Sequence, residues 1–137
     1  MLERILNTKL KAIWKLVFLV YIALILFLCF GRFDSMEDIP RLILGIPSDK
    51  VVHFLMFTPF TFFVGLAFFF KYIGKSKYIP VFIMMGMLIG FLFAITTEVG
   101  QHYIPYREAD PFDFIADAAG IIFGGGLVYL IDHFRTK

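Results

Sequence analysis

The sequence predicts an all-α integral membrane protein, a single domain over residues 1–137 built as a bundle of four transmembrane helices. Sixty per cent of the residues are apolar, only 18% are charged, and 19 are phenylalanine. A soluble domain has about 25% charged residues, and a chain of 137 residues has too little interior to bury so many phenylalanines. Lipid must therefore be the solvent for much of the surface.

Four apolar stretches are long enough to cross a membrane as helices. They cover about residues 12–30, 51–70, 79–97 and 112–131. A hydrocarbon core of about 30 Å requires about 20 helical residues, and no ten-residue alternating pattern favours a β-barrel. A cleaved signal peptide is the alternative for the basic start and first stretch. No small-x-small cleavage site follows it, and the residues before Cys29 are too bulky for lipoprotein cleavage, so we expect an uncleaved helix.

Basic residues are distributed unevenly around these four stretches. Nine lysines and arginines would lie on the side of the two termini, and four would lie on the opposite side. Cytoplasmic loops of membrane proteins are enriched in basic residues, so we expect both termini in the cytoplasm. Acidic residues show the opposite bias, because all except Glu3 and Asp132 fall outside or at the outer ends of helices.

The loop between the first two stretches, residues 31–50, spaces apolar residues three or four positions apart. These residues are Phe33, Met36, Ile39, Leu42, Ile43 and Ile46. The spacing favours a short amphipathic helix on the outer membrane interface. Pro40 would have to begin or interrupt that helix, so a plain loop is the alternative.

Ionisable and amide residues gather at the outer ends of three of the predicted helices. They are Asp49, Lys50, His53, Glu98, Gln101, His102, Arg107, Asp110, Asp113 and Asp117. Charges beside hydrocarbon are costly and usually face the interior of a bundle. The sequence therefore predicts one polar site on the extracytoplasmic side.

Metal and disulfide chemistry have little support in the sequence. The single cysteine, Cys29, excludes an internal disulfide and a cysteine-based zinc site. A metal site could be built from His53, Glu98, His102 and Asp113, but no spacing demands it, and we expect neither a metal nor another cofactor. A net charge of +2 without a basic run gives no indication of nucleic-acid binding.

Two rows of small residues lead to the predicted polar site. One row comprises Gly86, Gly90 and Ala94 and precedes Glu98; the other comprises Gly120 and Gly124 and follows Asp113 and Asp117. Small residues at helical spacing let helices pack closely in lipid. We expect the third and fourth helices to pack together along these rows.

Helix capping is an alternative explanation for several of the polar residues. Asp110 before Pro111 has the pattern of an N-cap followed by proline, with Asp113 at the third helical position. Ser48 and Asp49 could cap the second helix in the same way.

Helix capping does not explain two of the carboxylates. Asp117 lies too far inside the fourth helix to cap it. Glu98 lies near a helix C-terminus, where the helix dipole disfavours an anion. His53 has a simpler alternative, as a hydrogen-bond donor between helices. Glu98 and Asp117 therefore carry the functional expectation.

In chain order, the motifs are Asp49-Lys50-x-x-His53-Phe54, Glu98-x-x-Gln101 and Arg107-x-x-Asp110-x-x-Asp113-Phe114-x-x-Asp117-x-x-Gly120-x-x-x-Gly124. This set resembles the VanZ-like family, small bacterial integral membrane proteins named for a teicoplanin-resistance determinant. The likeness covers most of residues 48–126, although the family usually has Asn where this chain has Asp117. It implies a bacterial cell membrane and an association with glycopeptide antibiotic resistance, and it supplies no reaction.

Three functions remain open. The first is binding or modulation of a cell-envelope amphiphile, such as a lipid-linked wall precursor or a lipoglycopeptide. Lys50, Arg107 and helix N-termini would hold a phosphate or carboxylate, or the carboxylates would hold an amine. The second is a membrane enzyme with Glu98, Asp113 or His53 as catalytic acid or base. The third is a structural charge network that fixes helix packing, with Arg107 paired to Asp110 or Glu98.

Overall fold

The computed structural model describes residues 2–32, 42–72, 75–106 and 110–137, with side chains from residue 7 onward. Its helices are α1 (Leu2–Phe30), α2 (Ser48–Phe57), α3 (Phe60–Phe68), α4 (Ile79–His102) and α5 (Pro111–Arg135), with short 3₁₀ turns at Phe70–Tyr72 and Ser76–Tyr78. Four of the described helical segments are long and apolar enough to cross a membrane: Asn7–Phe30, Ser48–Phe68, Ser76–His102 and Pro111–Arg135. The prediction of an all-α, multi-pass membrane protein is confirmed.

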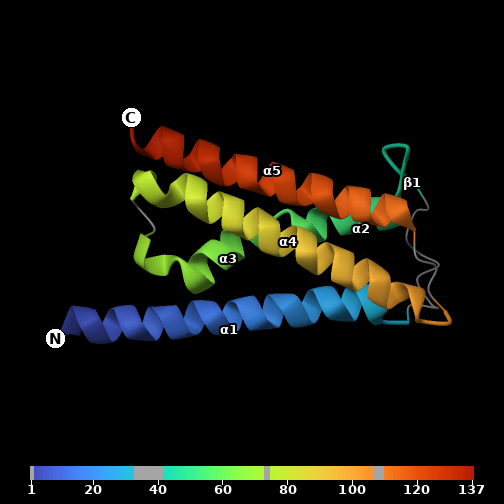
Figure 1. Ribbon diagram of the computed structural model, residues 1–137, viewed down its shortest axis with the longest axis horizontal. Helices are drawn as coiled ribbons and strands as arrows, with labels where there is room; N and C mark the ends of the chain where they lie inside the picture. Colours follow the sequence, from blue (N-terminus) through green and yellow to red (C-terminus); the bar gives the residue numbers. More distant parts are fainter. Residues whose placement is uncertain (1, 33–41, 73–74, 107–109) are drawn as a thin grey trace.

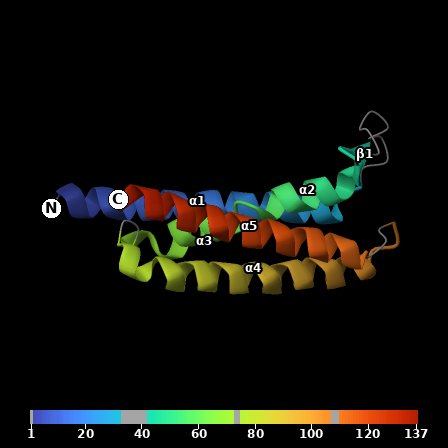
Figure 2. The ribbon, with the colours of Figure 1, turned by 90° about the horizontal axis from the view of Figure 1, so that it is seen from above.

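The four spans alternate in direction, so the two termini lie at the same end of the bundle (Figure 1). The α2 N-terminus, the α4 C-terminus and the α5 N-terminus lie at the opposite end, which places their polar residues together. Viewed from above, α3 lies between α1 and α4 (Figure 2), in agreement with its contacts to both helices. The most extensive contacts of α5 are with α2 and α4.

The second span consists of two helices, α2 and α3, separated by a break at Thr58 and Pro59 that the hydropathy pattern does not show. Pro59 lies at the break and has no N–H to donate to a preceding carbonyl. Thr58 Oγ1 donates to the carbonyl of Phe54 at 2.8 Å. Tyr21 of α1 donates its hydroxyl to the carbonyl of Met56 at 2.6 Å. The carbonyl of Phe54 also accepts the backbone N–H of Thr58 at 3.0 Å, and the Tyr21 hydroxyl gives the carbonyl of Met56 a partner at the end of α2.

The glycine row of α5 packs against α2, so the expected contact between the two glycine rows is wrong. A Cβ atom at Gly120 would collide with the carbonyl oxygen of Phe54, and one at Gly124 with the carbonyl oxygen of Thr58. Both glycines are buried. Only glycine permits so close an approach of two backbones.

The small residues of α4 face other partners. A Cβ atom at Gly86 would lie 2.9 Å from the side chain of Thr61 in α3. A Cβ atom at Gly90 would lie 3.1 Å from the side chain of Ile121 in α5. The predicted packing of α4 on α5 is therefore present, but it pairs a glycine with a large side chain. Periodicity identified the two helix faces and could not identify their partners.

A β-hairpin precedes α2. Its strands are β1 (Leu42–Ile43) and β2 (Ile46–Pro47). Leu44 and Gly45 connect them with φ angles of 52° and 80°, as a two-residue turn with left-handed backbone requires. The expected amphipathic helix is therefore wrong for residues 42–47, and its residues 33–41 lie outside the described part of the chain.

Phenylalanine rings fill the centre of the bundle. Phe57 stacks on Phe60 with ring centroids 5.8 Å apart, and Phe60 lies 5.6 Å from Phe93 of α4. Ile25 of α1 and Ile121 of α5 are fully buried in the same cluster. His53 lies one helical turn before Phe57 in α2, so the polar site begins where this aromatic core ends.

Candidate functional site

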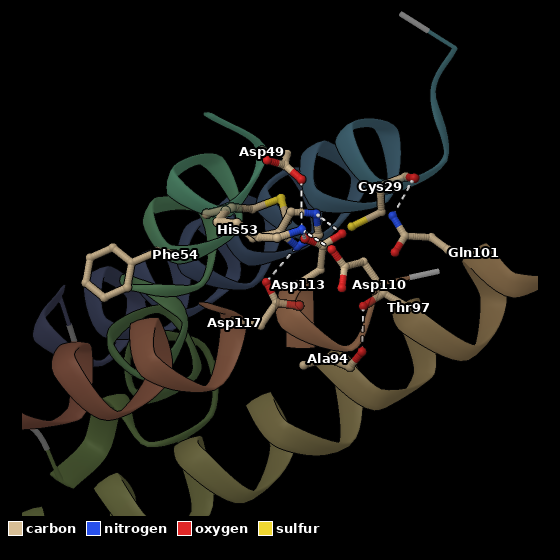
Figure 3. Close-up of polar contacts among 12 residues, drawn as sticks. Cys29, Asp49, His53, Phe54, Ala94, Thr97, Gln101, Asp110, Asp113 and Asp117 are labelled. Atoms are coloured by element: carbon tan, nitrogen blue, oxygen red, sulfur yellow. Dashed lines mark hydrogen bonds and ion pairs between the residues drawn. The ribbon is translucent and has the colours of Figure 1, made fainter. Parts of the chain in front are cut away.

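At the end of the bundle opposite the termini, the ammonium of Lys50 in α2 binds three carboxylates, those of Asp49, Asp110 and Asp113, which Figure 3 labels. The nearest are those of Asp110 and Asp113, each with an oxygen 2.5 Å from the ammonium nitrogen. Asp49 is bound at 2.9 Å. A lysine ammonium has three donors, so its hydrogen-bonding capacity is filled by these three residues.

His53 lies between two carboxylates of α5, those of Asp117 and Asp113. Its Nδ1 atom lies 2.8 Å from Oδ1 of Asp117, whose side chain is 1% exposed. An ionised carboxylate can only accept, so with Asp117 ionised the proton is on Nδ1. The Nε2 atom lies 3.7 Å from Oδ2 of Asp113, too far for a hydrogen bond. His53 is therefore held by Asp117 and faces Asp113.

The start of α5 explains how Asp110 is placed. Its Oδ1 atom accepts a hydrogen bond from the backbone N–H of Phe112 at 3.0 Å, and Pro111 follows as the first helical residue. The N-cap interpretation of Asp110 is confirmed. The Lys50 ammonium, together with this backbone hydrogen bond, holds the pKa of the Asp110 carboxyl below its usual range.

The other capping interpretations do not describe the structure. Helix α2 has Pro47 at its N-cap position and no side-chain cap, so Ser48 and Asp49 do not cap it. The side chain of Asp113 contacts Lys50 and faces His53, which places it in the polar site.

Helix α4 supplies polar groups that are less completely paired. Gln101 is 2% exposed and donates from Nε2 to the carbonyl of Cys29 in α1 at 2.9 Å, which ties the two helices together. Its Oε1 atom is shut off from solvent and has no partner among the described residues. The Oε2 atom of Glu98 is in the same situation. Buried acceptors without donors are rare and require an explanation.

A groove of about 440 Å³ opens between α4 and α5 beside Glu98. It is lined by Ile95, Glu98, Val99, His102, Pro111 and Phe114. The sequence analysis missed this groove, although its four α4 residues follow one another at steps of three, one and three, which places them on one helix face. Its wall is mostly apolar, with one carboxylate and one imidazole at its edge.

Among the described residues, one group of acidic side chains could hold a metal ion. Carboxylate oxygens of Asp49, Asp110 and Asp113 lie within 4.8 Å of one another. The ammonium of Lys50 binds all three, so a cation would have to displace it. The four residues considered from the sequence do not form such a group, and His102 is exposed and lines the groove.

The structure brings some of the predicted site residues together and does not bring others. Asp49, Lys50, His53, Asp110, Asp113 and Asp117 form one connected cluster, which Glu98 joins through electrostatic interactions. Gln101 is bound to α1, and Arg107 lies outside the described residues. Five carboxylates thus surround one lysine and one histidine. The excess of acidic groups makes this end of the bundle suited to a cationic group.

Comparison with known proteins gives one match. A family model described as VanZ/LLP1 matches residues 5–132, nearly the whole chain. No curated protein and no solved structure matches. The resemblance inferred from the motifs is confirmed at the level of the family.

Proposed function

This chain belongs to the VanZ-like family, and we propose that it is a binding protein of the bacterial cell membrane that holds a cell-envelope amphiphile. The amine-bearing head of the ligand contacts Glu98, and its apolar chain lies in the groove between α4 and α5. The observation that carries this proposal is the position of Glu98, which lines an apolar groove and whose buried Oε2 atom has no hydrogen-bond partner among the described residues.

An amine suits this site better than a phosphate. From the sequence, Lys50 was a candidate for holding an anion, but its three donors bind three carboxylates. A phosphate would have to break these pairs and would face the remaining acidic groups at short range. An ammonium group brings donors to Glu98 and reduces the excess of negative charge.

The proposal includes the orientation of the chain, with both termini in the cytoplasm and the polar site outside. The bias in basic residues supports this orientation. Reporter fusions after Lys137 and within residues 71–77 should be active as cytoplasmic reporters, and a fusion near Tyr106 should report the exterior. An exterior signal at Lys137 would overturn the orientation.

The family's association with teicoplanin resistance suggests the functional test. Cells that express the protein should become less susceptible to glycopeptides that carry a lipid chain, with little change towards those without one. Glu98→Gln should abolish the effect at an unchanged protein level. Thr96→Val is the matched control, because Thr96 is exposed on the same helix and its hydroxyl donates to the carbonyl of Leu92 in that helix. Equal protection by Glu98→Gln and the parent would contradict the proposal.

A membrane enzyme is the second candidate, and the geometry of His53 favours it. Asp117 holds Nδ1, and Nε2 faces the cluster near Asp113, an arrangement that suits a general base. An enzyme would release a chemically changed drug or precursor, which mass spectrometry of exposed membranes would detect. A binding protein would return the amphiphile unmodified.

A further inference from the structure

A second groove, of about 240 Å³, lies at the opposite end of the bundle from the acidic cluster. Its apolar walls come from α3, α4 and α5 and include Leu66, Phe82 and Val128. Two charged residues, Asp132 and Arg135, complete the lining. Both belong to the last turn of α5, at the end of the bundle where the two termini lie (Figure 1).

These two charged residues form an ion pair at the groove. The Nη2 atom of Arg135 donates to Oδ1 of Asp132 at 2.8 Å. The Asp132 side chain is 12% exposed, whereas that of Arg135 is 47% exposed. Among the described residues, the guanidinium donates only to Asp132, so further N–H groups of Arg135 remain for a ligand.

Helix stability does not explain the position of Asp132. An anion in the last turn of a helix is disfavoured by the helix dipole, and a carboxylate beside an apolar groove in lipid is costly. Arg135 compensates part of this charge at a spacing of three residues. A ligand with its own cation would supply the remaining compensation.

We propose that this groove binds a phospholipid with a phosphoethanolamine head. The phosphate accepts hydrogen bonds from Arg135, the primary ammonium donates to Asp132, and part of one acyl chain occupies the apolar groove. The paired positive and negative side chains are complementary to this zwitterionic head. A choline head has no N–H to donate, and a phosphoglycerol head has no cation. Asp132 is thus the residue that selects the head group.

Native mass spectrometry of the full-length protein in detergent tests this proposal with dioleoyl lipids that differ only in the head group. We expect phosphatidylethanolamine to bind about tenfold more tightly than phosphatidylcholine, the ratio expected of one charge-assisted hydrogen bond. Asp132→Asn should bring this ratio close to one. Arg135→Gln should weaken the binding of both lipids. Lys137→Gln, which removes a charge at the same end but outside the groove, should change neither.

A second variant keeps the test independent of the ion pair. Ile131 lines the groove and is 64% exposed, so Ile131→Trp should fill part of the space without disturbing the core. It should weaken the binding of phosphatidylethanolamine, phosphatidylcholine and phosphatidylglycerol alike. Equal binding of phosphatidylethanolamine and phosphatidylcholine by the parent would overturn the proposal. So would tightest binding of phosphatidylglycerol, which would indicate attraction by the basic residues alone.

Discussion

The two halves of the polar site differ in how completely their charges are paired. Between α2 and α5, Lys50 binds three carboxylates, and His53 is bound to Asp117 and faces Asp113. On α4, Glu98 and Gln101 each retain a buried oxygen without a donor among the described residues. Both halves lie at the same end of the bundle and combine similar residue types.

This difference separates a structural role from a binding role. Removal of one partner from a buried ion pair leaves an uncompensated charge, so paired residues hold helices together. An acceptor without a donor contributes nothing comparable to stability, and a ligand N–H group that reached it would supply the missing donor. The structural network considered from the sequence therefore fits the paired residues of α2 and α5, and we propose α4 as the side of the binding site.

The largest effect is expected where α2 and α5 approach most closely. Gly124→Leu should prevent folding, because any side chain there collides with the backbone of Thr58. We expect a loss of at least about 3 kcal/mol in the free energy of unfolding. Gly126→Leu is the matched control, since a Cβ atom at Gly126 meets nothing within 4 Å. Thermal unfolding in detergent should separate the two variants, and similar midpoints would show that the interface is wrong.

The next largest effect concerns the lysine that joins α2 to α5. Lys50→Met should reduce the free energy of unfolding by about 3 kcal/mol, because it leaves the nearly buried Asp113 without its cation. Lys50→Arg keeps the charge and should cost less. Lys15→Met changes an exposed lysine of α1 and should have little effect. A Lys50→Met protein as stable as the parent would show that the charge network does not stabilise the bundle.

A smaller, pH-dependent effect is expected at Asp110. Its pKa is lowered in the folded state by Lys50, so its ionised form stabilises the protein above the unfolded-state pKa of about 3.9 and this contribution is lost as the pH falls through the folded-state pKa. Asp110→Asn keeps a good helix cap and removes the charge. The parent should unfold at a slightly higher temperature than the variant at pH 7, and the difference should narrow below about pH 4. A difference in unfolding temperature that does not change with pH would show that the effect comes from helix capping and not from the charge.

Hydropathy was sufficient to predict the four spans, because the bilayer fixes the length of apolar helix that the chain must supply. It could not show the break at Pro59, since hydropathy averaged over a whole segment does not register a single proline. The hairpin around Gly45 was missed for a related reason. A three- or four-residue spacing of apolar residues in a short loop does not exclude two brief strands joined by a turn.

The sequence was sufficient to predict which end of the bundle holds the polar residues, but not which of these residues contact one another. Helix direction alone brings Lys50, Glu98 and Asp113 to one end of the bundle. Which of them contact one another depends on the rotation of each helix and on its neighbours, which periodicity does not determine. The sequence therefore suggested Lys50 as an anion-binding group, whereas the structure shows it surrounded by carboxylates. That Oε2 of Glu98 has no donor among the described residues is likewise visible only in three dimensions.

The central claim is that Glu98 binds an amine and does not support the fold. The most direct measurement is calorimetric binding of dodecylammonium and dodecyl phosphate to the purified parent and to Glu98→Gln in a neutral detergent. The two probes share one chain and differ in the charge of the head. Thermal unfolding of the same samples reports the stability of each protein.

The parent should bind dodecylammonium more tightly than dodecyl phosphate. Glu98→Gln should weaken binding of the ammonium probe at least tenfold, as expected for the loss of about 1.5–3 kcal/mol from a hydrogen bond to a charged group. Its free energy of unfolding should stay within about 0.5 kcal/mol of the parent. Unchanged binding of the ammonium probe together with lower stability would contradict the account and return Glu98 to the structural network.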